Sequence, residues 1–144
     1  MISKGAALAA AIGIGAAIAA GGAIAHADKM PANASAATKA AYARHENFEK
    51  IGANFKQLND ELRKPSPSKA VLATSAKNIH TFSTQLPTWF PRGSGVQARA
   101  MSEAKNEIWS DAAGFTAAAS NFRSEAGKLN TVAAGGDIEA IKAQ

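Results

Sequence analysis

The 144-residue chain contains no cysteine. Disulfide bonds, thiolate metal sites and thioether-linked cofactors are therefore excluded within this sequence. β-Branched apolar residues are also scarce, since only five Ile and three Val follow residue 27. The core of a β-sheet needs such residues at alternating positions, so a sandwich, a barrel or a parallel sheet is not expected.

Apolar residues in general are not scarce. They make up 47% of the chain, and alanine alone supplies 36 positions. This apolar content, combined with a formal net charge of only +5, argues against disorder. The length fits one domain. The basic residues are scattered singly among acidic ones, so no basic stripe is available for phosphates, and nucleic acid is not an expected partner.

The N-terminal segment has the three parts of a secretory signal peptide. Lys4 gives a positive start, residues 5–24 carry no charge, and Ala25-His26-Ala27 forms a small-x-small cleavage site. We expect residues 1–27 to be the signal peptide and residues 28–144 to be the mature domain. A transmembrane anchor is the alternative, because the uncharged run approaches the roughly 20 residues that span a bilayer. The weak hydrophobicity of Gly and Ala disfavours it.

Three long segments have apolar residues at alternating spacings of three and four, which predicts amphipathic helices over most of residues 34–134. The first stripe is Phe48, Ile51, Phe55, Leu58 and Leu62; the second is Leu72, Ser75, Ile79, Phe82 and Leu86; the third is Met101, Ala104, Ile108, Ala112, Phe115, Ala119, Phe122, Ala126 and Leu129.

Short breaks separate these segments. Residues 64–68 contain two prolines and end with Ser68, a helix-capping residue, and residues 87–95 are rich in Pro and Gly. The pair Gly135-Gly136 ends the third segment, and Asp137 can cap a short fourth helix. Short connections between long helices predict antiparallel neighbours. The sequence therefore predicts an all-α fold, an antiparallel four-helix bundle whose fourth helix is only begun in this chain.

Few residues suggest chemistry. His45 and Glu49 stand four apart, which is more simply a contact on a solvated helix face than part of a metal site. We expect no metal site in this chain. The sequence has no nucleophile elbow and no glycine-rich phosphate loop after a strand, so an enzyme is not expected.

Arg44 and the aromatic residues are the candidate functional residues. Arg44 falls on the apolar seam of the first helix, four residues before Phe48. Its guanidinium either reaches out to water at the end of the seam or stays at the mouth of a pocket to pair with an anion. Most of the aromatic residues suit either ordinary core packing or a pocket for a large planar cofactor. They are Phe48, Phe82, Trp89, Phe90, Trp109, Phe115 and Phe122.

Two stretches carry a more specific pattern. Residues 86–95 read Leu-Pro-Thr-Trp-Phe-Pro-Arg-Gly-Ser-Gly, and residues 107–115 read Glu-Ile-Trp-Ser-Asp-Ala-Ala-Gly-Phe. Together with Arg44 followed by Phe48, and with Lys128-Leu129 followed by Gly136-Asp137, they resemble the cytochrome c prime family, the class II c-type cytochromes. The resemblance extends from about residue 40 to residue 144.

The resemblance implies an antiparallel four-helix bundle, usually a homodimer, exported to the periplasm. It also implies haem c, bound through a Cys-x-x-Cys-His motif whose histidine is the axial ligand. The implied function is electron transfer or binding of small gases such as nitric oxide, with a redox protein or the gas as partner. Carried over by position, Arg44 would approach a haem propionate, Phe48 would lie over the distal face, and Trp89, Phe90, Phe115 and Phe122 would line the pocket.

The attachment motif is absent from the sequence, and the family pattern places it, with the axial histidine, beyond Gln144. Covalent haem attachment is thus not possible in the chain as given. Either the chain is a truncated cytochrome, which an intact seam up to the last helical turn favours, or it is a haem-free relative. The alternative function is a haem-free periplasmic bundle that serves as a binding or interaction module. A membrane-surface protein is disfavoured, because the seams are narrow and aromatic and lack dense flanking lysines.

Overall fold

The computed structural model describes residues 29–144. The predicted signal peptide, residues 1–27, lies outside the described residues. Within the described part the chain is helical and contains no strand, and none of its helices is long and apolar enough to cross a membrane. The elements are α1 (Ala36–Leu62), α2 (Lys69–Gln85), η1 (Leu86–Trp89), α3 (Glu107–Ser110), α4 (Ala112–Gly135) and α5 (Ile138–Ala143).

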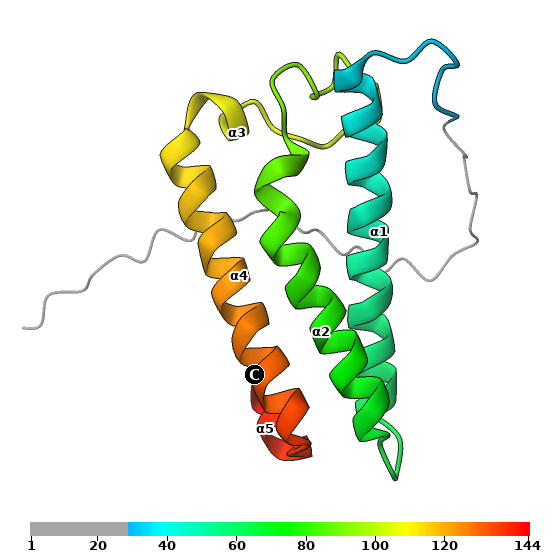
Figure 1. Cartoon of the computed structure of the whole chain (residues 1–144), viewed down its shortest axis with the longest axis vertical. Coiled ribbons are helices and arrows are strands. Elements are labelled where there is room, and N and C mark those ends of the chain that lie inside the picture. The colour runs from blue at the N-terminus through cyan, green and yellow to red at the C-terminus, as the bar shows by residue number, and fades with distance from the viewer. Residues whose placement is uncertain (1–28) are drawn as a thin grey trace, which may run out of the picture.

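The three long helices α1, α2 and α4 form the bundle, and consecutive long helices run in opposite directions (Figure 1). Helix α2 packs against both α1 and α4, which flank it. The short α5 folds back at the end of α4 and packs against it. The predicted all-α antiparallel bundle is confirmed, and α5 is its short fourth helix.

Side-chain caps determine where the helices begin. An oxygen of each capping residue accepts a hydrogen bond from the N–H three residues later, which satisfies a donor that the first helical turn leaves unpaired. Gly136 ends α4 with a φ of 69°, the left-handed conformation that glycine adopts most easily. The predicted caps at Ser68 and Asp137 are confirmed. The four capping residues are Ser35, Ser68, Asp111 and Asp137.

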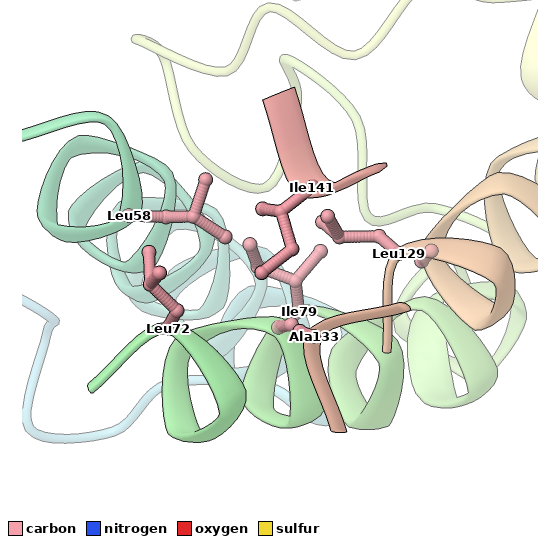
Figure 2. Close-up of a cluster of buried hydrophobic side chains, with 8 residues drawn as sticks. Leu58, Leu72, Ile79, Leu129, Ala133 and Ile141 are labelled. Carbon is pink, nitrogen blue, oxygen red and sulfur yellow. The ribbon is translucent and has the colours of Figure 1, made fainter. Parts of the chain in front are cut away.

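An aliphatic core fills the end of the bundle that carries α5. Ile141 of α5 points into the space between α1 and α4, where it meets Leu58 and Leu129 (Figure 2). Leu72 and Ile79 of α2 are completely buried beneath them. We call this set the aliphatic core: Leu58, Leu72, Ala76, Ile79, Ala126, Leu129, Ala133 and Ile141.

Aromatic side chains occupy the opposite half of the bundle. Trp89 is buried there beside Ile51, Leu86 and Ala119, whereas the phenylalanines are only half-buried. We call the aromatic members of this set the aromatic cluster: Phe48, Phe82, Trp89, Phe90, Phe115 and Phe122.

Three residues of the predicted apolar stripes are exposed, namely Phe55, Met101 and Ala112. Phe55 was expected in the common core, but 36% of its surface is accessible. It stands seven residues from both Phe48 and Leu62, which is about 10 Å along the helix axis in either direction. Phe48 packs in the aromatic cluster and Leu62 packs against the aliphatic core, so Phe55 falls between the two.

The third predicted helix starts later than its apolar spacing indicates. Residues 101–106 form no helix, Met101 is 60% exposed, and α3 and α4 are separate helices. The Ser102 hydroxyl accepts hydrogen bonds from Arg44 and from the N–H of Ala104. Such side-chain bonds to nearby backbone compete with helix formation, and here the contact with Arg44 adds to them.

Candidate functional site

The aromatic cluster brings together rings from α1, α2, η1 and α4. The ring centroids of Phe48 and Trp89 are 5.6 Å apart at an interplanar angle of 85°, and those of Phe90 and Phe115 are 5.0 Å apart at 67°. Edge-to-face pairs of this kind are favoured because the positive edge of one ring meets the negative face of another. Phe122 packs against both this cluster and the aliphatic core. The structure therefore unites the five aromatic residues that the sequence suggested for a pocket.

Trp109 was part of the aromatic pattern but not of the predicted pocket. Its indole Nε1 donates a hydrogen bond of 3.0 Å to the backbone oxygen of Phe90, and the two rings lie 6.4 Å apart. Gly95 lies against the same indole, because a Cβ there would come within 3.3 Å of the ring. Trp109, a residue of α3, thus contacts the segment that follows η1 and holds it next to α3.

Arg44 is buried, with only 4% of its surface accessible, so the first of the two alternatives for this residue, that it reaches out to water, is wrong. Its Nη1 donates to the backbone oxygen of Trp89 at 3.1 Å and to the Ser94 hydroxyl at 2.9 Å. Its Nη2 donates to the backbone oxygen of Ser94 at 2.6 Å and to the Ser102 hydroxyl at 3.1 Å. The guanidinium carbon lies 4.7 Å from the ring centroid of Phe90. Arg44 therefore lies beside the aromatic cluster, and its pairing with an anion stays a prediction.

Burial affects the charge of Arg44. Desolvation lowers the pKa of the guanidinium below its usual value, and the nearby positive charge of Arg99 lowers this pKa further. The four acceptors of Arg44 are all neutral oxygens. The charge is therefore stabilised by backbone and hydroxyl dipoles at these contacts.

Ser94 and Ser102 were not predicted as site residues. Ser94 is completely buried, and its hydroxyl donates to the backbone oxygen of Pro91 while it accepts from Arg44. No spacing in the sequence marks either serine. The only available signal was Arg44 itself, because an arginine on a buried seam must find acceptors.

The two histidines of the described residues lie elsewhere. His45 Nε2 is 3.3 Å from Glu49 Oε1 on the exposed face of α1, so the predicted solvated contact is confirmed. His80 lies against Gly127 of α4, next to Ala126 of the aliphatic core. Among residues 29–144 no group of three or more His, Cys, Asp or Glu side chains is arranged to hold a metal ion.

Two surface hollows lie outside the aromatic cluster. One of about 370 Å³ lies between the 92–97 loop and α3, and one of about 340 Å³ lies along α1. The rings of the aromatic cluster do not line either hollow.

Comparison with known proteins agrees with this geometry. The family model described as Cytochrome C′ matches residues 39–144. A protein named cytochrome c′ from Rubrivivax gelatinosus is 38% identical over 103 residues, covering 69% of this chain and 77% of that protein. The chain belongs to the cytochrome c prime family. No solved structure matches the chain at a comparable level.

Membership of the cytochrome c prime family implies haem c, and the residues present can be tested against it. The half-buried rings offer an apolar surface suited to a porphyrin. The 144 residues contain no cysteine for a thioether bond. His45 is exposed on α1 and His80 packs beside the aliphatic core, so neither belongs to the aromatic cluster. The residues present therefore fit contact with the ring but do not fit covalent attachment or ligation of the iron.

Proposed function

We propose that the chain is the pocket-forming part of an exported cytochrome c prime that transfers electrons or binds a small gas such as nitric oxide. The haem would be attached through a Cys-x-x-Cys-His segment beyond Gln144, and its histidine would be the axial ligand. The protein would be an electron carrier or a gas-binding protein rather than an enzyme. The observation that carries this proposal is the half-buried aromatic cluster in a chain of this family.

The burial pattern supports an occupant at the aromatic cluster. Five phenylalanines converge there without becoming fully buried, although the same bundle buries Leu72 and Ile79 completely at its other end. Apolar side chains that gather in one cluster and keep part of their surface accessible can mark a binding site. A planar apolar ring system would remove that surface from water.

Phe48 has the clearest individual role within this proposal. Its ring packs edge-to-face on Trp89, so its position is defined by the protein. Phenylalanine has no lone pair, so Phe48 would not itself ligate a haem iron. Over the distal face, its ring would hinder another ligand by its volume. We expect small diatomic molecules to enter by displacing the ring and larger ligands to bind weakly.

The first experiment determines the coding sequence after Gln144 and searches it for an in-frame Cys-x-x-Cys-His motif, which would attach the haem. The extended and the 144-residue proteins are then produced with haem-attachment machinery and compared by absorption spectroscopy. We expect a covalent, five-coordinate haem in the extended protein and no covalent haem in the 144-residue chain. A six-coordinate resting spectrum would contradict the role of Phe48. A covalent haem in the 144-residue chain would contradict the whole proposal.

The pocket is tested by Phe48→Ala in the extended protein. We expect faster ligand binding, because the ring no longer blocks the distal side. Phe55→Ala is the matched control, since Phe55 lies on the same helix and is exposed. Equal ligand-binding rates for Phe48→Ala and the unsubstituted protein would refute the distal role.

A haem-free binding or interaction module remains the second candidate function, favoured by the absence of cysteine in the 144 residues. A coding sequence without the attachment motif would support this candidate. For both candidates we propose export to the periplasm, a mature N-terminus at Asp28 and a homodimer. N-terminal sequencing of periplasmic protein and sedimentation analysis test these points.

A further inference from the structure

The guanidinium of Arg44 is fully engaged at its two terminal nitrogens. Each of these nitrogens carries two N–H groups in a rigid planar fork. The four N–H groups face four acceptors in three residues, namely Trp89, Ser94 and Ser102. An external carboxylate could bind both nitrogens only if some of these bonds were given up. The existing contacts therefore point to a role for Arg44 within the chain itself.

The acceptors lie in a segment with little regular structure of its own. Between η1 and α3, residues 90–106 contain no helix or strand. The backbone bonds within this segment are local turns, such as Ser94 N–H to the oxygen of Pro91 and Ser102 N–H to the oxygen of Arg99. Local turns do not determine where a loop sits on the bundle. The bonds from Arg44 do, because they join α1 to residues 45 to 58 positions away.

The same contacts reach the aromatic cluster. Arg44 bonds the backbone of Trp89 and stacks on the ring of Phe90, while Trp109 bonds the backbone of Phe90 from the other side. Trp89 and Phe90 are thus held between Arg44 of α1 and Trp109 of α3. Their rings in turn contact Phe48, at 5.6 Å from Trp89 and 6.4 Å from Phe90.

We propose that Arg44 is a positioning residue that holds the 89–102 loop against α1 and thereby sets the positions of Trp89 and Phe90 in the aromatic cluster. This role differs from the pairing with a haem propionate that the family resemblance suggests. It does not depend on haem, because every contact involved belongs to this chain. Its test therefore uses the haem-free 144-residue protein, where the outcome is separate from that of the proposed function.

Arg44→Lys is the principal variant, because lysine keeps the positive charge but replaces the planar fork with a single ammonium on a flexible stem. Ser102→Ala is the milder variant, since it removes one acceptor and leaves Arg44 in place. Arg63→Lys is the matched control at the C-cap of the same helix, where the side chain is 79% exposed. Hydrogen exchange of the loop amides and near-UV circular dichroism of the tryptophans are measured for each.

We expect amides of residues 92–102 to exchange about tenfold or more faster in Arg44→Lys, because bonds to a charged donor are lost. The near-UV signal should fall, since Trp89 loses its defined surroundings. The amides of residues 72–79 in α2 should keep their exchange rates, and Arg63→Lys should match the unsubstituted protein. Ser102→Ala should produce a smaller change in the same loop.

Two outcomes would overturn the proposal. One is unchanged exchange in residues 92–102 in both Arg44→Lys and Ser102→Ala, which is what a residue reserved for an external carboxylate predicts. The other is a uniform acceleration of the loop and of α2, which would show that Arg44 supports the bundle as a whole. If Arg44→Lys does not fold, Ser102→Ala decides between these results, because it leaves Arg44 in place and removes only one of its four bonds, together with the bond from the N–H of Ala104.

Discussion

The two ends of the bundle bury apolar surface in different ways. At one end Leu72 and Ile79 are completely buried, and Ile141 of α5 closes over them. At the other end the phenylalanines of the aromatic cluster meet edge-to-face and stay half-buried. The aliphatic core is thus closed to solvent, whereas the rings of the aromatic cluster keep part of their surface accessible, as the proposed function requires.

The buried charges differ as well. Near the aliphatic core, the buried carboxylate of Glu61 accepts from Lys64 Nζ and from the backbone N–H of Ser68, each at 2.7 Å, and so holds the α1–α2 turn. Beside the aromatic cluster, Arg44 is a buried cation held by neutral oxygens, and the nearby Arg99 is buried as well. One end uses a carboxylate to join two helices, and the other uses a guanidinium to place a loop.

The largest effect is expected for Leu72→Ala. Leu72 is 0% exposed and lies beside Leu58 in the aliphatic core, so the change leaves a cavity between α1 and α2. We expect a loss of about 3 kcal/mol in the free energy of unfolding. Urea unfolding followed by far-UV circular dichroism measures it. A loss below about 1 kcal/mol would mean that this end is not a closely packed core.

Phe115→Ala probes the other end. A fully buried phenylalanine would lose about 3–5 kcal/mol on this change. Because Phe115 keeps part of its surface accessible, we expect a smaller loss than this and than for Leu72→Ala, about 2 kcal/mol, measured in the same urea unfolding experiment. If Phe115→Ala destabilised the protein more than Leu72→Ala does, the division of the bundle into a stabilising end and a binding end would be refuted.

Sequence patterns foretold much of the fold because most of its determinants are local. Helical spacing and caps such as Ser68 and Asp137 act within a few residues, so they can be found without tertiary information. The same spacing failed at Met101, which continues the apolar stripe but lies in an exposed loop. The spacing of apolar residues carries no information about the next residue, Ser102, whose hydroxyl accepts a hydrogen bond from Arg44 of α1.

The candidate site was predicted in part for the same reason. The aromatic residues could be selected because seam spacing brings them to one side of each helix, and they do converge. The partners of Arg44 could not be selected, since Ser94 and Ser102 lie in a loop whose course depends on Arg44 and Trp109. Contacts 50 and 58 residues apart leave no local pattern.

Acidification should affect the aliphatic end through Glu61. The hydrogen bond from Lys64, followed by that from the backbone of Ser68, lowers the pKa of this carboxyl below its usual 4.5. Because the folded pKa is below the unfolded one, this contribution is complete above about pH 4.5 and is lost as the pH falls through the folded value. Unfolding free energies measured from neutral pH down to acid should therefore fall less steeply in Glu61→Gln.

Two other carboxyl groups limit the size of this change. The pKa values of Asp60 and Glu125 are also lowered, chiefly by hydrogen bonds from Lys56 and Lys128, so part of the acid dependence should remain in Glu61→Gln. Glu46→Gln, at an exposed position of the same helix, is the control for the change in net charge. Identical profiles for the two variants would show that Glu61 does not hold the turn electrostatically.

The smallest effect is expected for Phe55→Ala, which tests the boundary between the two ends. Phe55 has the apolar spacing of a core residue but lies between the aromatic cluster and the aliphatic core, with 36% of its surface exposed. Its ring gives up less contact when removed than the less exposed rings of the aromatic cluster do, and alanine has the higher helix propensity, which offsets part of the loss. We expect the free energy of unfolding to stay within about 0.5 kcal/mol of the unsubstituted protein in urea titrations at low protein concentration.

Repeating the Phe55→Ala titration at rising protein concentration sharpens the comparison. If the ring is solvent-exposed in solution, the difference between variant and unsubstituted protein should not depend on concentration. A difference that grows with concentration would place Phe55 in a contact between two copies of the chain, because association stabilises a folded protein by mass action. A loss above about 1 kcal/mol at every concentration would instead mean that the two apolar regions are continuous through Phe55, and that the bundle has one core rather than two distinct ends.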